Sequence, residues 1–214
     1  MSVVIPTLNA APHLRDCLGR IGAGPEILIV DGGSTDETIR IAEASGARVI
    51  VAPKGRGNQL LAGGEGARGT WLLFLHADTR LGAGWREAME AHVAGSTHPA
   101  CFRFRLDDAA WQARLIERGV AVRVRLLGLP YGDQGLLVSR RHYDLAGGYR
   151  PLPLMEDVDL VRRLGKVKLL GADAVTSAER WRRDGWFRRS GKNLSLLAGY
   201  YLGMSPERIA RRYD

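Results

Sequence analysis

The first half of the chain alternates short, almost continuously apolar runs with longer segments of helical spacing. Four apolar runs are typical of buried strands: SVVIP, EILIVD, RVIVAP and TWLLFLHAD. The segments between and after them predict helices: APHLRDCLGRIG, STDETIRIAEASG, GNQLLAGGEGARG and LGAGWREAMEAHVAG. Apolar strands that alternate with helices are covered on both faces, so we predict an α/β fold with a mostly parallel sheet.

Two helices carry more specific signals. The first has its apolar positions at Leu14, Cys17, Leu18 and Ile21, one face of a helix. The second begins in a Ser/Thr/Asp cluster, and Glu37 lies three residues after Ser34. That spacing predicts a capping box at the start of the helix.

The second half is less regular. ACFRFRLD alternates like a half-exposed strand, AWQARLIERGVAVRVRLLG predicts a basic amphipathic helix, and YGDQGLLVSR a turn into a strand. MEDVDLVRRLG predicts a helix that opens with acids. One or two short helices are expected in the tail, the last capped by Ser205 with Pro206 in its first turn. Since no repeat, low-complexity tract or linker divides the chain, we expect one domain over residues 1–214.

Composition narrows the class of protein. Of 214 residues, 45% are apolar and 25% charged, as in soluble globular proteins. Cys17 and Cys101 lie far apart without metal-ligand spacing, so we interpret them as small buried hydrophobes in a reducing compartment. No signal-peptide pattern opens the chain, and NLSLLAGYYLGM is shorter than the roughly 20 residues that span a bilayer. We therefore expect a cytoplasmic protein, with peripheral contact at the inner membrane face as an option.

The net charge of +8 is concentrated in RLIERGVAVRVR and in the tail from Arg180 to Arg212. Such patches attract anionic lipid, phosphorylated small molecules or nucleic acid, or form a solvated face. The chain has no helix-turn-helix, zinc-finger or RNA-binding signature, and only 7% of its residues are aromatic. Nucleic acid is therefore the least favoured partner.

A loop with polar residues follows each of the four predicted parallel strands: PTLNA, DGGSTDE, APKGRGNQ and HADTR. Ligands of doubly wound sheets bind at this edge. Asp31 ends the second strand, where a carboxylate can accept a bond from a base or ribose, and Gly32 and Gly33 permit a sharp turn. The alternative is a plain strand–turn–helix with Ser34 or Asp36 as the N-cap. No G-x-G-x-x-G dinucleotide fingerprint follows the first strand.

The motifs SVVIPTLNA, IVDGGSTDET, GRGNQL and LLFLHADT resemble, in order and spacing, the nucleotide-binding half of family 2 glycosyltransferases. YGDQGL, LPLMEDVDL and TSAERW resemble one subgroup, the arsenosugar-biosynthesis glycosyltransferases. The resemblance implies the GT-A fold, the Rossmann-like fold of nucleotide-diphospho-sugar transferases. It places a nucleotide-binding half at about 1–98 and an acceptor-side half at about 99–214.

The resemblance assigns the donor to the first half. The loop from Pro6 to Asn9 would pack around the base, Asp31 would read it (usually uracil), and GRGNQ would line the diphosphate and sugar. The donor positions are Pro6, Thr7, Asn9, Asp31, Gly33, Arg56, Gln59, His76, Ala77 and Asp78. A surface arginine and a helix-face glutamine are the alternatives for Arg56 and Gln59.

The tip HAD matches the D-x-D motif of the family with its first acid replaced. Asp78 matches the acid that holds a divalent metal, Mg²⁺ or Mn²⁺, against the two phosphates. One carboxylate suffices when phosphates and waters supply the other oxygen ligands. For His76 we favour a neutral imidazole that donates to a ribose hydroxyl; a histidine satisfied within the protein is the alternative, and metal ligation is less favoured.

The resemblance also assigns residues to the role of catalytic base and to the acceptor side of the site. Asp157 matches the general base, with Glu156 supporting it, although a helix start favours acids in any case. Asp159 is expected to be solvated. Asp133 and Gln134 are candidates for binding sugar hydroxyls, or else form only a turn. Arg180 and Trp181 resemble the R-W element beside the acceptor, with core packing as the alternative for Trp181. Ser177 replaces the glutamine of the full Q-x-x-R-W pattern, which argues against polymer synthesis.

These matches predict an inverting glycosyltransferase that moves a sugar from a UDP-type donor to a hydroxyl of a small-molecule or lipid-linked acceptor. One alternative is a nucleotidyltransferase with a related sheet, but PTLNA stands where a G-x-G-T-R loop belongs. The other is a non-enzymatic basic protein that binds nucleic acid or lipid. That alternative leaves the acids at Asp31, Asp78 and Asp157 unexplained.

Overall fold

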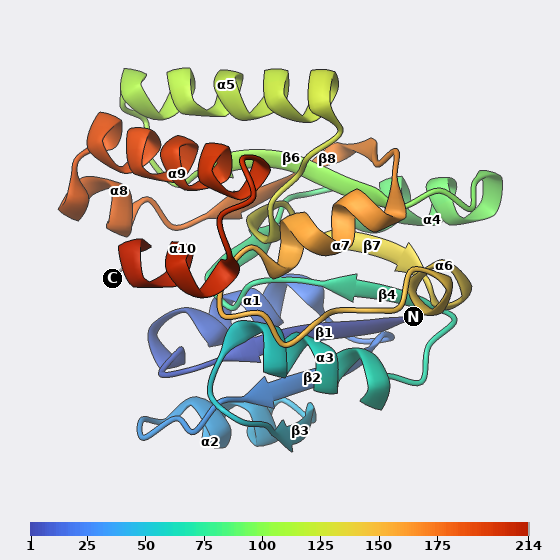
Figure 1. Ribbon diagram of the computed structural model, residues 1–214. Coiled ribbons are helices and arrows are strands. Elements are labelled where there is room, and N and C mark those ends of the chain that lie inside the picture. The colour runs from blue at the N-terminus through green and yellow to red at the C-terminus, as the bar shows by residue number, and fades with distance from the viewer. Residues whose placement is uncertain (214) are drawn as a thin grey trace.

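A single eight-stranded sheet runs through the protein in the computed structural model, which describes residues 1–213 (Figure 1). The strand order is β3-β2-β1-β4-β7-β6-β8-β5. The strands are β1 (Ser2–Thr7), β2 (Glu26–Asp31), β3 (Arg48–Val51), β4 (Trp71–Phe74), β5 (Thr79–Leu81), β6 (Ala100–Leu106), β7 (Leu136–Ser139) and β8 (Lys168–Thr176). The strands β1 to β4 are parallel to one another, whereas β7 pairs antiparallel with both β4 and β6, and β5 pairs antiparallel with β8. The predicted mostly parallel α/β sheet is confirmed.

Four helices of the first half cover this sheet: α1 (Ala11–Ile21), α2 (Thr38–Ala44), α3 (Arg56–Gly66) and α4 (Trp85–Gly95). The predicted apolar face of α1 is confirmed, because Leu14, Cys17, Leu18 and Ile21 are all buried. The predicted capping box of α2 is wrong. The helix begins at Thr38, the Ser34 hydroxyl donates to Asp31, and the preceding Glu37 makes no cap bond with its side chain. Instead, Oδ1 of Asp36 accepts the backbone N–H of Thr38 (3.0 Å), as the alternative role of Asp36 at the helix start indicated.

The second half adds α5 (Trp111–Leu127), the short 3-10 helix η1 (Gly132–Gln134), α6 (Arg140–Leu145), α7 (Glu156–Leu164), α8 (Glu179–Asp184), α9 (Trp186–Tyr201) and α10 (Pro206–Tyr213). The sequence patterns did not predict β5 or β8, and they indicated only short helices where α9 has 16 residues. β8 is long but carries Gly171 and Asp173, which weaken its strand pattern. The hydroxyl of Ser205 accepts a hydrogen bond from Arg208 N–H (3.4 Å), as expected for the cap of α10.

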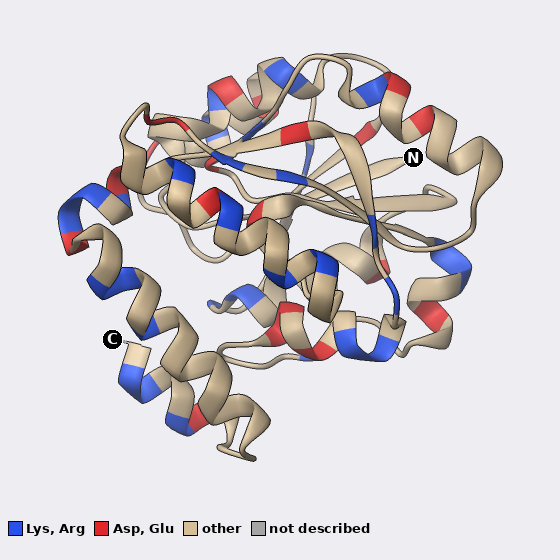
Figure 2. Ribbon diagram, turned by 90° about the horizontal axis from the view of Figure 1, so that it is seen from above, with Lys and Arg blue, Asp and Glu red and all other residues tan. Residues whose placement is uncertain are grey.

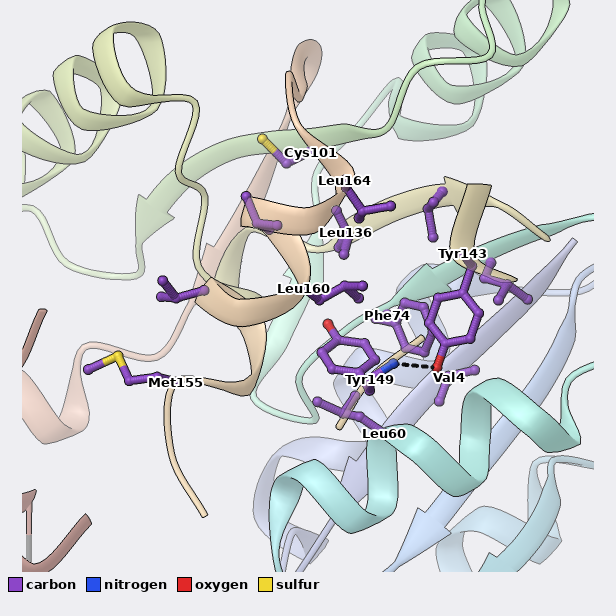
Figure 3. Close-up of a cluster of buried hydrophobic side chains, with 14 of the residues drawn as sticks. Val4, Leu60, Phe74, Cys101, Leu136, Tyr143, Tyr149, Met155, Leu160 and Leu164 are labelled. Carbon is purple, nitrogen blue, oxygen red and sulfur yellow. Dashed lines mark hydrogen bonds between the residues drawn. The ribbon is translucent and has the colours of Figure 1, made fainter. Parts of the chain in front are cut away.

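Aromatic rings from segments that are distant in the sequence pack together in one part of the hydrophobic core (Figure 3). Phe74 stacks on Tyr143 with ring centroids 5.3 Å apart and meets Tyr149 edge-on at 4.8 Å. The Tyr149 N–H donates to the Tyr143 hydroxyl (3.0 Å). A Cβ on Gly64 would overlap that hydroxyl, so the absence of a side chain there lets α3 pack closely against this cluster.

Both cysteines behave as the sequence indicates. Cys17 and Cys101 are free and fully buried, and burial raises the pKa of each thiol to about 12. They pack as small apolar side chains. Among residues 1–213, no helix is both long and apolar enough to cross a membrane.

Candidate active site

A cleft of about 140 Å³ lies next to the carboxyl end of β4. Segments from both halves of the chain form its walls: the start of α3, the tip after β4, η1, the start of α7, the end of β8 and the helices α8 to α10. Its lining residues are Arg56, His76, Asp78, Tyr131, Gly132, Asp133, Leu154, Met155, Asp157, Thr176, Ser177, Arg180, Trp181, Arg189, Asn193, Leu196 and Tyr213. The cleft therefore lies at the sheet edge where ligands of such folds bind.

Seven of the predicted site residues line this one cleft: Arg56, His76, Asp78, Asp133, Asp157, Arg180 and Trp181. They are separated by up to 125 positions in the sequence, and only the fold brings them together. The mixture of acids and arginines suits a ligand that carries negative charge and arrives with a cation.

Asp78 and Asp133 supply the oxygen atoms that fit a metal ion. Oδ1 of each is buried and has no hydrogen-bond partner in the described part of the chain. Burial raises the pKa of Asp133 to about 6; the nearby Asp157 and Asp78 add to the effect and Arg123 opposes it. Residues 1–213 contain no group of three His, Cys, Asp or Glu side chains that could hold a metal by themselves. A hard cation here would need phosphate oxygens or waters as further ligands.

His76 faces η1 and is held as a neutral imidazole. Burial and then the neighbouring Arg56 guanidinium lower its pKa to about 4. A Cβ on Gly132 would lie only 2.5 Å from Nε2 of His76, so no other residue fits at position 132 without movement. A neutral imidazole agrees with the predicted hydrogen bond from His76 to a ribose hydroxyl. That hydrogen bond stays a prediction.

Asp157 stands in the first turn of α7 and lines the cleft, although it is only 8% exposed. Its Oδ2 accepts the backbone N–H of Gly132 (2.9 Å), and its Oδ1 accepts that of Val158 (2.8 Å). The two N–H donors hold both carboxylate oxygens in place beside the positive end of the helix dipole. The carboxyl group is thus fixed in one orientation at the cleft wall.

Glu156 lies behind the cleft and not in it. It is 1% exposed, and its Oε1 accepts a hydrogen bond from Nε of Arg56, so the first turn of α7 is linked to the first turn of α3. Burial raises the pKa of Glu156, and Arg56 opposes that effect. Burial likewise disfavours the charge on Arg56, yet Glu156 and Asp157 raise the pKa of its guanidinium overall. Glu156 therefore holds Arg56 against the cleft.

This pair yields a stability prediction. Replacing Arg56 with Ala leaves the buried Glu156 carboxylate unpaired, which we expect to lower the free energy of unfolding by about 2 to 4 kcal/mol. The double variant Arg56→Ala/Glu156→Gln should recover part of the loss in urea denaturation, because no buried charge remains. As a control, Arg40→Ala removes an exposed pair with Glu37 and should cost at most about 0.5 kcal/mol. Equal losses in the single and double variants would contradict the pairing.

The five predicted donor residues Pro6, Thr7, Asn9, Asp31 and Gly33 form a separate group at the ends of β1 and β2. Asp31 is fully buried and accepts four hydrogen bonds, from Gly33 N–H, Ser34 N–H, the Ser34 hydroxyl and the Thr7 hydroxyl. Although burial favours the neutral acid, these bonds hold the pKa of Asp31 below its ordinary value. A base would have to replace one of these donors, so the nucleobase role of Asp31 stays a prediction.

The expectations for four residues need correction or narrowing. Asp159 is not solvated: it is 9% exposed and pairs with Arg163 (2.6 Å) and Arg150 (3.4 Å). Gln59 does not reach the cleft, because its buried amide donates to the carbonyls of Thr7 (2.6 Å) and Val30 (2.8 Å).

Gln134 is likewise buried and donates to Phe102 O (3.1 Å). Ala77 is half-buried in the tip and outside the cleft lining. Of the four predicted acceptor-side residues, the cleft therefore holds Asp133, Arg180 and Trp181.

The sequence patterns missed the contribution of the C-terminal helices. Arg189, Asn193 and Leu196 of α9 and Tyr213 of α10 line the cleft. Arg189 lies 5.4 Å over the Trp181 ring and donates to the Tyr213 hydroxyl (3.3 Å). The only sequence signal was the basic, aromatic character of the tail, which also fits a solvated face.

The fold and the cleft define an α/β protein with a charged ligand site at one sheet edge. The family model "Glycosyl transferase family 2" matches residues 2–118, more than half of the chain. The chain belongs to glycosyl transferase family 2.

Curated relatives match part of the chain. A "PGL/p-HBAD biosynthesis glycosyltransferase" of Mycobacterium bovis is 43% identical over 91 residues, which cover 37% of this chain and 36% of the relative. A Mycobacterium tuberculosis protein described as an uncharacterized glycosyltransferase is 38% identical over 85 residues, 39% of each chain. The match thus spans little more than a third of the length of these relatives.

Solved structures share the fold. TarS of S. aureus in complex with UDP-GlcNAc has a TM-score of 0.62 at 16% identity, over 82% of this chain and 58% of that one. Glucosyl-3-phosphoglycerate synthase of Mycobacterium tuberculosis, in complex with Mn²⁺, UDP and phosphoglyceric acid, has a TM-score of 0.56 at 19% identity, over 78% and 66%. The predicted GT-A fold is confirmed.

Proposed function

We propose that this chain is an inverting glycosyltransferase that moves a sugar from a UDP-type donor to a hydroxyl of a small-molecule or lipid-linked acceptor. The observation that carries the proposal is the convergence of Asp78, Arg56 and Asp157 from separate segments on one cleft. We further propose that residues 1–214 act as one GT-A domain, whose first half binds the donor and whose second half binds the acceptor.

The donor end of the site is the tip after β4. A divalent cation, Mg²⁺ or Mn²⁺, would be held by Asp78 with Asp133 beside it, and their unpartnered buried oxygens support this assignment. When bound, the cation neutralises the charge that develops on the departing nucleoside diphosphate. Arg56 and Arg180 line the same cleft and supply fixed positive charge for the phosphates. The Mn²⁺ and UDP of the mycobacterial synthase agree with this donor class.

Asp157 is the proposed general base. Its carboxylate takes the proton from the acceptor hydroxyl as that oxygen forms the new bond to the sugar, while the bond to the nucleoside diphosphate breaks on the opposite face. The Gly132 N–H fixes one carboxylate oxygen and the Val158 N–H fixes the other, so the group is oriented before the proton arrives. Attack opposite to the leaving group inverts the sugar carbon.

The acceptor side is formed by Trp181 and its neighbours. The Trp181 ring stacks on Trp186 at 6.5 Å and also lines the cleft, so it offers an apolar face to a sugar or a lipid-linked ring. Asn193 of α9 adds an amide that can bind a hydroxyl.

A product assay separates this function from that of a nucleotidyltransferase. Purified protein is incubated with a panel of nucleotide sugars, Mn²⁺ and simple hydroxyl acceptors, and release of nucleoside diphosphate is measured. In parallel, it is incubated with nucleoside triphosphates and sugar phosphates, and release of pyrophosphate is measured. We expect UDP release above the buffer rate and no pyrophosphate. Pyrophosphate release without UDP release would overturn the proposal.

A further inference from the structure

The helices α5 and α9 lie side by side and present an unusual outer surface (Figure 1). Thirteen large apolar side chains are exposed among the described residues, and nine of them belong to α5, α9 or the residue after α9. We call these nine the α5–α9 surface: Trp111, Leu115, Val122, Leu126, Leu127, Phe187, Leu194, Tyr201 and Leu202. Such a concentration marks an interaction site, since monomeric proteins scatter their exposed apolar residues.

The apolar residues follow one stripe on each helix. On α5 the exposed positions Trp111, Leu115 and Val122 are four and seven residues apart, and on α9 Phe187 and Leu194 are seven residues apart, so each set lies on one face of its helix. The rings of Trp111 and Phe187 lie 5.9 Å apart, so the two stripes join at the N-terminal ends of the helices. The result is a continuous surface and not two separate patches.

Positive charge accompanies the stripes. The two helices carry seven Arg or Lys and one Glu, a net +6 of the chain's +8. The single acid, Glu117, is buried and paired with Arg105 and Arg114, so neither helix exposes an acid. Figure 2 shows in blue where Lys and Arg stand along the helices. Exposed Arg118 and Arg125 alternate with the apolar residues along α5.

A groove adjoins the C-terminal ends of these helices. Its volume is about 1000 Å³, and its walls combine four cations with apolar side chains and no acid. The cations are Arg125, Arg162, Lys166 and Lys168, and the larger apolar residues include Leu126, Leu127, Leu169 and Tyr201. The Arg162 guanidinium lies 5.1 Å over the Tyr201 ring. Cations beside apolar walls suit a molecule with an anionic head and a hydrocarbon body.

We propose that the α5–α9 surface and the adjoining groove dock this protein on an anionic lipid bilayer. Apolar side chains of the stripes enter the headgroup region, while the arginines and lysines meet lipid phosphates. A second copy of the chain fits less well, because two such surfaces would bring like charges together without an acid to pair them. The inner face of α9 contributes Asn193 and Leu196 to the cleft, so docking would place the active site beside the membrane.

Vesicle flotation tests the proposal. We expect the unmodified protein to float with vesicles made of equal parts phosphatidylglycerol and phosphatidylcholine, and much less with phosphatidylcholine alone. Leu126→Ser/Leu202→Ser keeps the charge but removes two apolar contacts, and should weaken binding about tenfold or more. Val51→Ser/Leu145→Ser is the matched control: Leu126 and Leu145 are both 75% exposed, but Val51 and Leu145 lie outside the surface. The control should bind within about twofold of the unmodified protein.

Three outcomes would overturn the proposal. The first is absence of flotation with anionic vesicles, and the second is equal binding by the surface variant and its control. The third is a dimer in light scattering that the surface variant dissociates, which would assign the surface to self-association. The second outcome can be examined further with the variant Arg118→Gln/Arg125→Gln. If this variant abolishes binding while the leucine variant still binds like its control, the surface is a general polyanion site. The measurement needs no donor or acceptor, so it stands apart from the test of glycosyl transfer.

Discussion

Replacing Asp157 with Asn is expected to reduce the rate of sugar transfer by between about 100-fold and 10,000-fold, the usual contribution of a general base. The amide has nearly the same shape but cannot take the proton from the acceptor hydroxyl. UDP affinity should change little, because the proposed base faces the acceptor and not the phosphates. Initial rates at saturating donor, together with the Kd for UDP, measure both effects.

Asp159→Asn is the matched control for that variant. Asp159 lies on the same helix, is similarly buried, and pairs with Arg163 and Arg150 instead of lining the cleft. Its loss should lower the thermal midpoint and leave the rate per folded molecule within about twofold. If Asp157→Asn retained most of the activity, or lost UDP binding together with activity, Asp157 would be structural and not the base.

The second large effect concerns Asp78. In Asp78→Asn, UDP affinity in Mn²⁺ should fall by about tenfold or more, equivalent to about 1.4 kcal/mol. In EDTA the variant and the unmodified protein should bind UDP equally weakly, because the metal contact is then absent from both. The unliganded variant should be at least as stable, since Asp78 holds a buried oxygen without a partner near two other carboxylates. Calorimetric titration and a thermal melt read these two effects separately.

Asp16→Asn provides the control for Asp78. The Asp16 side chain is 67% exposed on α1 and lies outside the cleft, so the change removes the same charge at a distance. Its UDP affinity should match that of the unmodified protein in Mn²⁺. A loss of affinity in Asp78→Asn that persisted equally in EDTA would show that Asp78 acts through the fold and not through a metal.

Much of the fold could be predicted, because strands buried on both sheet faces are continuous apolar runs in the sequence and the helices that cover them have apolar residues at helical spacing. The four parallel strands and α1 follow from apolar runs and spacing alone. β8 could not be found in this way, because its exposed positions and Gly171 break the pattern and its place beside β6 is set by long-range pairing.

The candidate site likewise has features that the sequence could predict and features that it could not. That Asp78, Asp133 and Asp157 share a cleft depends on β7, which enters the sheet antiparallel beside β4 and carries η1 to the tip. The sequence could not show that Gln59 turns inward, because the close packing of α3 on β1 and β2 directs its amide to backbone carbonyls. The pairing of Asp159 with Arg163, four positions later, could have been recognised from its helical spacing.

The proposed function depends on metal-assisted binding of a uridine nucleotide in the cleft, and calorimetric titration of UDP measures this binding most directly. The prediction is binding of one UDP per chain in Mn²⁺, with affinity that falls sharply when EDTA removes the metal. ADP and GDP should bind more weakly than UDP under the same conditions. Failure of UDP to bind in Mn²⁺, or equal binding of all three nucleotides regardless of metal, would contradict the proposed function.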